Sequence, residues 1–452
     1  MTSIFLFSVL RSFCIALLTA FIAAKIIKTY LSSPKKTRHL ILLALLFPLL
    51  TPPLLPAYAY SSFKINFQTS PFLNEITYFL ITTTRFLPYA VLALFMLNYS
   101  ADYSSNVCDR LSPGKKLSFI RKHSTPIIAF FLPFLLCLHE YETASLMRIR
   151  HWSIEVFNAH SGGLSQTMWS SFKMILNPLS ISIILIIFAL NLMKFTPLNI
   201  SRSSSIQSSR SCLIQLVLAL LLAISFFIPL VIISYSGISA FSEIFSTGWM
   251  FKESLNSTIF AMIATICLAF ISLVLINSSK KILILALIPG LCGNLILGLA
   301  ILNIFQLPGL NSLGHSVLPL TLALILYGLP LSLLLNFCFS KKYKDSSIKT
   351  AELLPEIEKN RIFWQLRTIP FVLCQFPVYC LIWFDLTLST LLAPSSMPGI
   401  FPRLYNLMHY NENEKLSATV VVAVLVPPII LAVTLMISRI GAKWIQGRFS
   451  GS

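Results

Sequence analysis

Two carboxylates lie near the ends of long apolar runs in this sequence, where charged residues are rare. Glu140 follows the run PIIAFFLPFLLCLH, and Asp385 follows PFVLCQFPVYCLIWF. A charged side chain that faces lipid is costly, so we expect both to face the interior of the molecule or the membrane interface. They could form a gate or a polar patch beneath a substrate-binding protein, or they could simply pair with arginine or with backbone N–H groups.

Two arginines also fall inside apolar runs, at Arg11 and Arg85. Either could pair with a carboxylate inside a helix bundle, or extend its guanidinium outward to the membrane surface. Because Arg85 comes early in its apolar run, its position is most simply that of an interface anchor.

Histidines and acidic residues gather between positions 139 and 160, which raises the question of a metal site. The residues concerned are His139, Glu140, Tyr141, Glu142, His151, Glu155 and His160. Their spacing fits no standard ligand set, and the nine cysteines show no paired spacing. The sequence therefore predicts no metal, no cofactor and no disulfide framework.

A nucleotide-binding motif is missing from the sequence. The segment Ser112-Pro113-Gly114-Lys115-Lys116 contains a Gly-Lys pair but lacks the upstream glycine of a phosphate-binding loop. Any ATP hydrolysis linked to this chain must therefore be carried out by another subunit. The sequence contains no nucleophile motif and no pair of carboxylates within one span, so nothing in it indicates an enzyme.

The composition excludes an ordinary soluble protein. Of 452 residues, 56% are hydrophobic and 11% are charged, whereas soluble domains carry about 25% charged residues. Apolar runs of about 20 residues predict membrane-spanning helices. Eleven runs meet this criterion, near 4–24, 40–60, 78–98, 126–146, 175–194, 212–235, 258–277, 282–304, 316–338, 370–393 and 418–438. The sequence therefore predicts an all-α polytopic membrane protein.

The basic residues predict the orientation in the membrane. Twenty-five of the 34 Lys and Arg fall in one alternate set of connecting segments, seven in the other set and two within spans. Because basic loops are retained on the cytoplasmic side, the N-terminus is expected outside and the C-terminus inside. We therefore attribute the net charge of +19 to the membrane topology and to contact with membrane lipid, and expect no binding of nucleic acid. Residues 1–24 lack the basic start of a signal peptide, so they are expected to remain as a span.

An internal repeat relates the two halves of the chain. Pro126 and Pro133 correspond to Pro370 and Pro377 at an offset of 244, and one inserted residue brings Glu140 onto Asp385. Upstream, Pro48 corresponds to Pro289. The predicted organisation is a first unit at 1–196, a linker with an additional span at 197–257, and a second unit at 258–452. The additional span would make two five-span units parallel, as in some transporters.

The chain resembles the fused permease subunit of a bacterial binding-protein-dependent ABC importer of the ferric-iron or thiamine type. The similarity covers nearly the whole chain and is most specific in LSTLLAPSSMPGIFPRLYNLMHYNENEKLSATVVVAVLVPPIILAVTL, residues 388–435. The resemblance implies location in the bacterial cytoplasmic membrane, an ATP-binding subunit in two copies and a periplasmic solute-binding protein as partners.

Such permeases contact their ATPase through a cytoplasmic loop with a Glu-Ala-Ala motif, a following Gly and a Leu-Pro that enters the membrane. The corresponding loops here are VCDRLSPGKKLSFIRKHSTP (107–126) and AELLPEIEKNRIFWQLRTIP (351–370), in which Ile357 replaces the Gly of the second motif. The resemblance assigns ATPase coupling to Asp109, Arg110, Gly114, Pro126, Glu352, Glu356, Arg361 and Pro370.

Proline and glycine interrupt the second span of each unit. Pro48, Pro52, Pro53 and Pro56 do so in the first unit, and Pro289, Gly290 and Gly293 in the second. Such breaks are tolerated in a membrane where the freed backbone groups are buried or line a cavity, although a kink in a packed helix would have the same sequence. The predicted permeation path comprises Pro52, Pro53, Glu140, Thr143, Gly290, Gly293, Asp385 and Ser389.

Three functions remain open from the sequence. The leading hypothesis is a permease that passes a small solute across the membrane with ATP hydrolysed by a separate subunit. An ion-coupled secondary transporter would need ionisable residues within the membrane, for which only Arg11, Arg85, Glu140 and Asp385 qualify. A permease-derived scaffold that no longer transports is the third.

Overall fold

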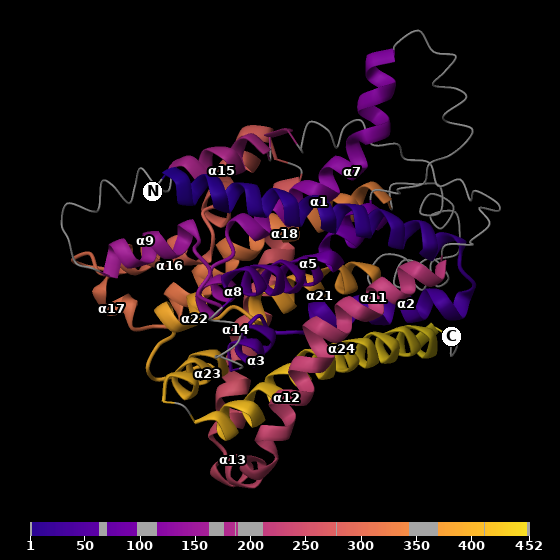
Figure 1. Cartoon of the computed structure of the whole chain (residues 1–452). Coiled ribbons are helices and arrows are strands. Elements are labelled where there is room, and N and C mark those ends of the chain that lie inside the picture. The colour runs from indigo at the N-terminus through magenta and orange to yellow at the C-terminus, as the bar shows by residue number, and fades with distance from the viewer. Residues whose placement is uncertain are drawn as a thin grey trace.

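The computed structural model describes residues 2–62, 70–96, 115–161, 176–185, 187–188, 211–276, 278–342, 369–410 and 412–449. All regular secondary structure in these ranges is helical, so the all-α prediction is confirmed for the described part of the chain. The apolar helices run across the molecule, with α1 beginning on the left and α24 ending on the right of Figure 1.

The N-terminal part, up to residue 188, contains three helices of 24 to 31 residues and several shorter ones. Its labelled helices are α1 (Thr2–Ser32), α2 (Lys35–Leu49), α3 (Leu54–Ser62), α5 (Pro71–Met96), α7 (Lys115–Leu138), α8 (Glu142–Leu146) and α9 (Trp152–Ser161). A connecting region follows, with α11 (Ser211–Leu222), a π-helical turn, α12 (Ile228–Gly237) and α13 (Phe241–Thr247).

The C-terminal part, from residue 249, has a similar succession of helices. These are α14 (Trp249–Ile276), α15 (Lys280–Leu291), α16 (Asn294–Phe305), α17 (Asn311–Gly314), α18 (Leu318–Lys342), α21 (Ile369–Trp383), α22 (Thr387–Leu392), α23 (Ile400–His409) and α24 (Asn413–Phe449).

The described residues contain six helices long and apolar enough to cross a membrane, or up to eight if each of two bent pairs is one span. This number is compatible with a multi-pass membrane protein. The expected total of eleven is not reached within the described ranges. Three of the expected spans coincide with apolar helices of only 10–17 residues, at Pro126–Leu138, Leu176–Leu185 and Phe371–Trp383. The first of these segments belongs to α7, whose 24 residues extend about 36 Å at 1.5 Å per residue, and the other two border residues outside the described ranges.

The two bent pairs occur where the sequence predicts interruptions. The pair α2 and α3 bends by 74° and the pair α15 and α16 by 106°. Pro52 and Pro53 stand in the first bend, where they have no backbone N–H to continue the helix. Gly293 stands in the second with a φ of +83°, a conformation that glycine adopts without steric cost.

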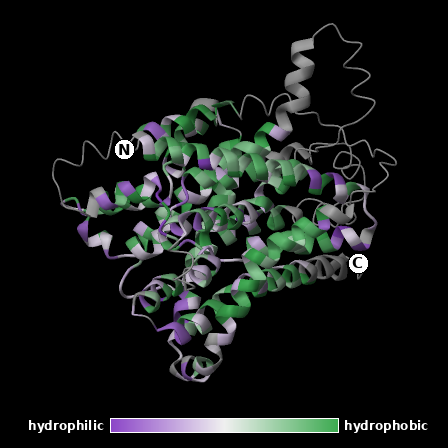
Figure 2. Ribbon diagram, in the orientation of Figure 1, coloured by the Kyte–Doolittle hydropathy of each residue, from purple (hydrophilic) through white to green (hydrophobic). Residues whose placement is uncertain are grey.

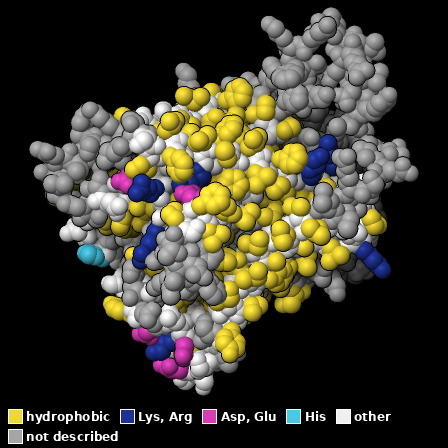
Figure 3. All heavy atoms as spheres, in the orientation of Figure 1, with side chains coloured by type: hydrophobic (Ala, Val, Ile, Leu, Met, Phe, Trp, Pro, Cys, Tyr) yellow, Lys and Arg dark blue, Asp and Glu magenta, His cyan; other side chains and the backbone are white. Residues whose placement is uncertain are grey.

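Apolar side chains cover much of the outer surface. On α1, Leu6, Leu10, Phe13, Leu17 and Phe21 recur every three or four residues and are each about half exposed or more. Figure 2 shows that hydrophobic residues dominate the crossing helices, and Figure 3 shows a broad hydrophobic face with few charged side chains. Such a face is compatible with a surface that contacts lipid.

The interior brings the two parts of the chain together. Helix α1 packs on α5 and α7, α14 packs on α18 and α21, and α5 also contacts α18. The contact between α5 and α18 matters most for the site, because it places the N-terminal part directly against the C-terminal part near the ends of α7 and α21.

Candidate functional site

A buried charged cluster lies where α7 and α21 end and the bend between α15 and α16 comes close. We define the cluster as Arg85, Glu140, Glu142, Asn294 and Asp385. The three carboxylate residues are 3–6% exposed, although Asp385 and Glu140 are 245 positions apart in the sequence. Their proximity is therefore a product of tertiary packing.

Glu140 connects the end of α7 to the beginning of α8. One of its carboxylate oxygens accepts a hydrogen bond of 2.8 Å from the backbone N–H of Thr143. This bond satisfies an N–H group that a helix leaves unpaired in its first turn. The other oxygen lies 2.6 Å from a guanidinium nitrogen of Arg85.

Arg85 is the cation of the cluster. It lies in the middle of α5, because that helix begins at Pro71 and not near residue 78 as the sequence suggests. Its guanidinium contacts Glu140 at 2.6 Å and approaches Glu142 at 4.0 Å. The interpretation of Arg85 as an interface anchor is therefore wrong, and the alternative of pairing inside the bundle is correct.

Asp385 repeats the arrangement of Glu140 at the beginning of α22. One oxygen accepts a hydrogen bond of 2.7 Å from the backbone N–H of Leu388. The other accepts one of 3.0 Å from the side-chain amide of Asn294. Both carboxylates thus hold the first turn of a short helix, but Asp385 has an amide beside it where Glu140 has a guanidinium.

Glu142 joins the N-terminal part to the C-terminal part. One of its oxygens accepts hydrogen bonds from the backbone N–H groups of Leu386 and Thr387, at 2.8 and 3.1 Å. The Thr387 hydroxyl donates to the same oxygen at 3.2 Å, and the Asn294 amide at 3.4 Å. The sequence pattern suggested Glu142 only as a metal ligand, so sequence reasoning missed this role. The offset that pairs Glu140 with Asp385 also pairs Glu142 with Thr387, which is the signal that could have found it.

The bend between α15 and α16 positions Asn294. A Cβ atom on Gly293 would lie 3.0 Å from the Nδ1 atom of His139, and one on Gly290 would lie 2.3 Å from the carbonyl oxygen of Leu326. Both glycines therefore allow close approach of backbone and neighbouring helices. Asn294, the first residue of α16, is held between Glu142 and Asp385 as a result.

A cavity of about 110 Å³ borders the charged cluster. Its lining includes Arg85, Glu140, Glu142, Asn294 and Tyr327, together with apolar side chains of α7, α18 and α21. Gly290 and Gly293 also line it. We refer to this space as the central cavity. With three carboxylates and one guanidinium, the cluster around it has more potential negative than positive charge.

Five of the predicted path residues are not among those that line the central cavity, namely Pro52, Pro53, Thr143, Asp385 and Ser389. Pro52 and Pro53 are buried and border a small recess that Arg85 also lines. The Thr143 hydroxyl lies 3.4 Å from the Arg85 guanidinium. Ser389 lies in α22, one turn after Asp385, and is not among the residues that line the cavity.

The expected coupling residues are only partly described. Asp109, Arg110, Gly114, Glu352, Glu356 and Arg361 lie outside the described residues. Pro126 lies inside α7 and Pro370 is the second residue of α21.

The remaining ionisable residues singled out by the sequence lie outside the cluster. Arg11 pairs with Glu75 at 2.8 Å and donates to the carbonyl oxygen of Arg150 at 3.0 Å. His151 is 1% exposed and contacts the Ser153 hydroxyl at 2.7 Å. Burial lowers the pKa of His151 to about 3, so this imidazole is neutral near pH 7. Among the described residues, no group of three His, Cys, Asp or Glu could hold a metal ion.

Comparison of the chain with protein-family models, with curated proteins and with solved structures finds no match. The functional argument therefore depends on the residues of this chain and on their geometry.

Proposed function

We propose that this chain is the transmembrane permease subunit of an importer, and that its solute passes between the N-terminal and C-terminal parts through the central cavity. The observation that carries the proposal is the meeting of helix breaks from both parts around buried charges. Irregular backbone at membrane depth is typical of transporter paths, because the freed polar groups then face a cavity and not lipid.

The proposal includes the internal repeat predicted from the sequence. Each part has a long helix, a bent pair, a second long helix and a helix that ends at a carboxylate-capped short helix. This order supports two parallel units, predicted at 1–196 and 258–452 with the region 197–257 between them, although α14 begins at Trp249, inside the predicted linker. In the proposed orientation the N-terminus is outside and the C-terminus is in the bacterial cytoplasm.

Helices α7 and α21 are proposed to transmit movement from the ATP-binding subunit to the charged cluster during the transport cycle. Each connects a predicted coupling loop at one end to the charged cluster at the other. A separate ATP-binding subunit that moved these loops would therefore move Glu140 and Asp385. Rigid rocking of the two parts would then open and close the path.

Glu142 is proposed to stabilise the closed conformation. Its carboxylate accepts three hydrogen bonds from Leu386 and Thr387 across the boundary between the parts. Separation of α8 from α22 would break all three. We expect Glu142→Ala to increase labelling of Leu331→Cys, a cavity-lining position, by a membrane-impermeant thiol reagent. Unchanged labelling would remove Glu142 from the gating step.

The deciding experiment is affinity purification of the full chain in mild detergent. We expect a stoichiometric ATPase to accompany the wild-type chain and to be lost from Glu352→Arg and Glu356→Arg. Glu155→Arg, on the opposite predicted side, is the matched control and should retain the ATPase. If no ATPase accompanies the chain under conditions that preserve a known ABC importer, the permease proposal is wrong.

An ion-coupled secondary transporter is the second candidate, and the excess of carboxylates around the central cavity favours it. Buried carboxylates within a transporter commonly bind the coupling ion. In that case Asp385→Asn should abolish uptake of the solute, whereas deletion of ATPase genes should leave uptake intact. A permease-derived scaffold would show neither an ATPase dependence nor uptake.

A further inference from the structure

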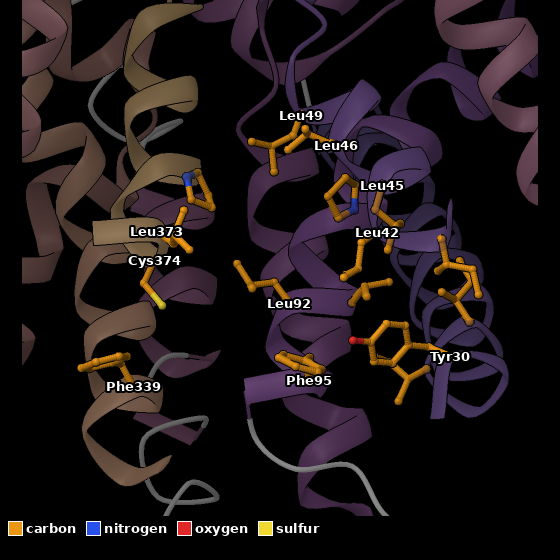
Figure 4. Close-up of a pocket in the computed structure, with 16 residues that line it drawn as sticks. Tyr30, Leu42, Leu45, Leu46, Leu49, Leu92, Phe95, Phe339, Leu373 and Cys374 are labelled. Carbon is orange, nitrogen blue, oxygen red and sulfur yellow. The ribbon is translucent and has the colours of Figure 1, made fainter. Parts of the chain in front are cut away.

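A second and larger cavity lies between the two parts of the chain, away from the charged cluster. Its volume is about 390 Å³. Figure 4 shows Leu42, Leu45 and Leu92 on one side of this cavity and Phe339, Leu373 and Cys374 on the other. We refer to it as the apolar cavity. It is within the size range of about 300–1,000 Å³ that is common for small-molecule sites.

The lining of this cavity is almost entirely hydrocarbon. Its side chains come from Ile, Leu, Val, Phe and Pro residues, with Cys374 and the hydroxyl of Tyr30 as the exceptions. Within the described part of the chain, no charged, amide or carboxyl side chain lines it. Water in such a space would lack the polar partners that ordered water needs, so the chemistry of the walls fits a hydrocarbon chain.

Side chains of α2 and α21 that line the apolar cavity also reach the surface of the molecule. Two lining side chains there, Leu42 and Leu373, are 49% and 39% exposed. Their neighbours Leu40 and Leu43 are more exposed still, at 66% and 55%. Apolar side chains exposed to this extent on a spanning helix face lipid, so a lipid chain can enter from the side.

Basic residues lie close together in the sequence where α1 ends and α2 begins. Arg38 lies one helical turn before Leu42, and its guanidinium lies 5.8 Å from the ring centre of Tyr30, which lines the cavity. Arg38 also donates to the carbonyl oxygens of Ser33 and Leu31 at the end of α1. Lys28 and Lys36 are exposed nearby in the sequence, and the first 74 residues contain no Asp or Glu.

We propose that an anionic phospholipid binds here, with one acyl chain in the apolar cavity and its phosphate beside Lys28, Lys36 and Arg38. The positive charges of the three basic residues favour an anionic headgroup, and the apolar lining of the cavity favours an acyl chain. Since both parts of the protein line the cavity, the lipid would link them at the end opposite to Glu142. This inference is independent of the solute and of the energy source proposed above.

Native mass spectrometry of the purified full chain tests the proposal. After exchange into micelles with equal phosphatidylglycerol and phosphatidylcholine of identical chains, we expect retention of phosphatidylglycerol. Leu92→Trp, which fills the cavity, should abolish that retention, whereas Leu425→Trp on exposed α24 should not. Lys36→Gln should weaken retention about five-fold, and Lys252→Gln on α14 should leave it unchanged.

Labelling of Cys374 provides a second measurement that needs no substitution. In the lipid-depleted wild-type chain, N-ethylmaleimide should modify Cys374, as read by peptide mass spectrometry. Added phosphatidylglycerol should slow this reaction but not the reaction of exposed Cys14. Equal retention of both lipids would overturn the anionic headgroup. Retention that survives Leu92→Trp in a folded chain, or Cys374 labelling insensitive to phosphatidylglycerol, would overturn the site.

Discussion

The breaks that follow α7 and α21 differ in what stands beside the carboxylate that holds the next short helix. After α7, Glu140 contacts the Arg85 guanidinium at 2.6 Å. After α21, Asp385 accepts hydrogen bonds from the neutral amide of Asn294 and from the backbone N–H of Leu388. In both breaks a carboxylate accepts a hydrogen bond from the first turn of the next short helix. The breaks differ in the charge of the side chain that faces the carboxylate.

This difference assigns unequal tasks to the two breaks. The break after α7 has a buried ion pair, so we expect its contacts to remain intact when α7 moves. The break after α21 depends on hydrogen bonds from Asn294 and from its own helix, and Glu142 adds a link from the other part. Since hydrogen bonds from a neutral donor are weaker than those between two charged groups, we expect the break after α21 to be the more easily moved.

The largest expected effect follows removal of the cation. Arg85→Leu leaves Glu140 and Glu142 buried without this positive partner, which typically costs about 3–5 kcal/mol for a buried pair. The free energy of unfolding, measured by SDS titration of the chain in mixed micelles, should fall by this amount. Adding Glu140→Gln to Arg85→Leu should recover part of the loss. Equal stability of the single and double variants would contradict the pairing.

The comparison itself is tested by neutralising each carboxylate in turn. Glu140→Gln removes a hydrogen bond between charged groups and should cost about 1.5–3 kcal/mol. Asp385→Asn keeps an acceptor for the Leu388 N–H group and gives up no ion pair with a described residue, so its cost should be smaller. Both are read in the same SDS titration. Costs of equal size would show that the two breaks do not differ electrostatically.

Gly293→Ala tests how closely the bend between α15 and α16 approaches the end of α7. Its φ of +83° and the contact with His139 should together destabilise the chain by about 1–3 kcal/mol. Gly309→Ala is the matched control, because Gly309 has a φ of +94° but a Cβ added there would meet no atom of the described residues within 4 Å. If both variants lose the same stability, the approach to His139 has no energetic weight.

The smallest effect is expected at Ser389. This predicted path residue lies in α22 outside the lining of the central cavity, so Ser389→Ala should change the unfolding free energy by no more than about 0.5 kcal/mol. Solute uptake by the variant should match that of the wild type. A strong loss of uptake would extend the path beyond the cavity and along α22.

Much of the helical architecture follows from local sequence. Apolar runs predict the crossing helices because each must hydrogen-bond its own backbone in lipid. Pro52, Pro53 and Gly293 predict the bends because proline lacks an N–H donor and glycine permits positive φ. The predicted total of eleven spans is not confirmed, because the described residues contain six to eight candidates. The helices that contain Pro126 and Pro370 stop at Leu138 and Trp383, where the chain turns into carboxylate-capped short helices.

The sequence by itself determined where helices break and where two carboxylates stand at the ends of apolar runs. Only the tertiary structure decided which groups meet there. Arg85 reaches Glu140 across 55 positions, Asn294 reaches Asp385 across 91, and Glu142 reaches Leu386 across 244. Helix breaks and charges in apolar runs can be found from the local sequence, because exposing a backbone group or a charge to lipid is costly. Which residues pair across such separations depends on how the helices pack. The partners of Glu140, Glu142 and Asp385 are therefore a property of the folded molecule.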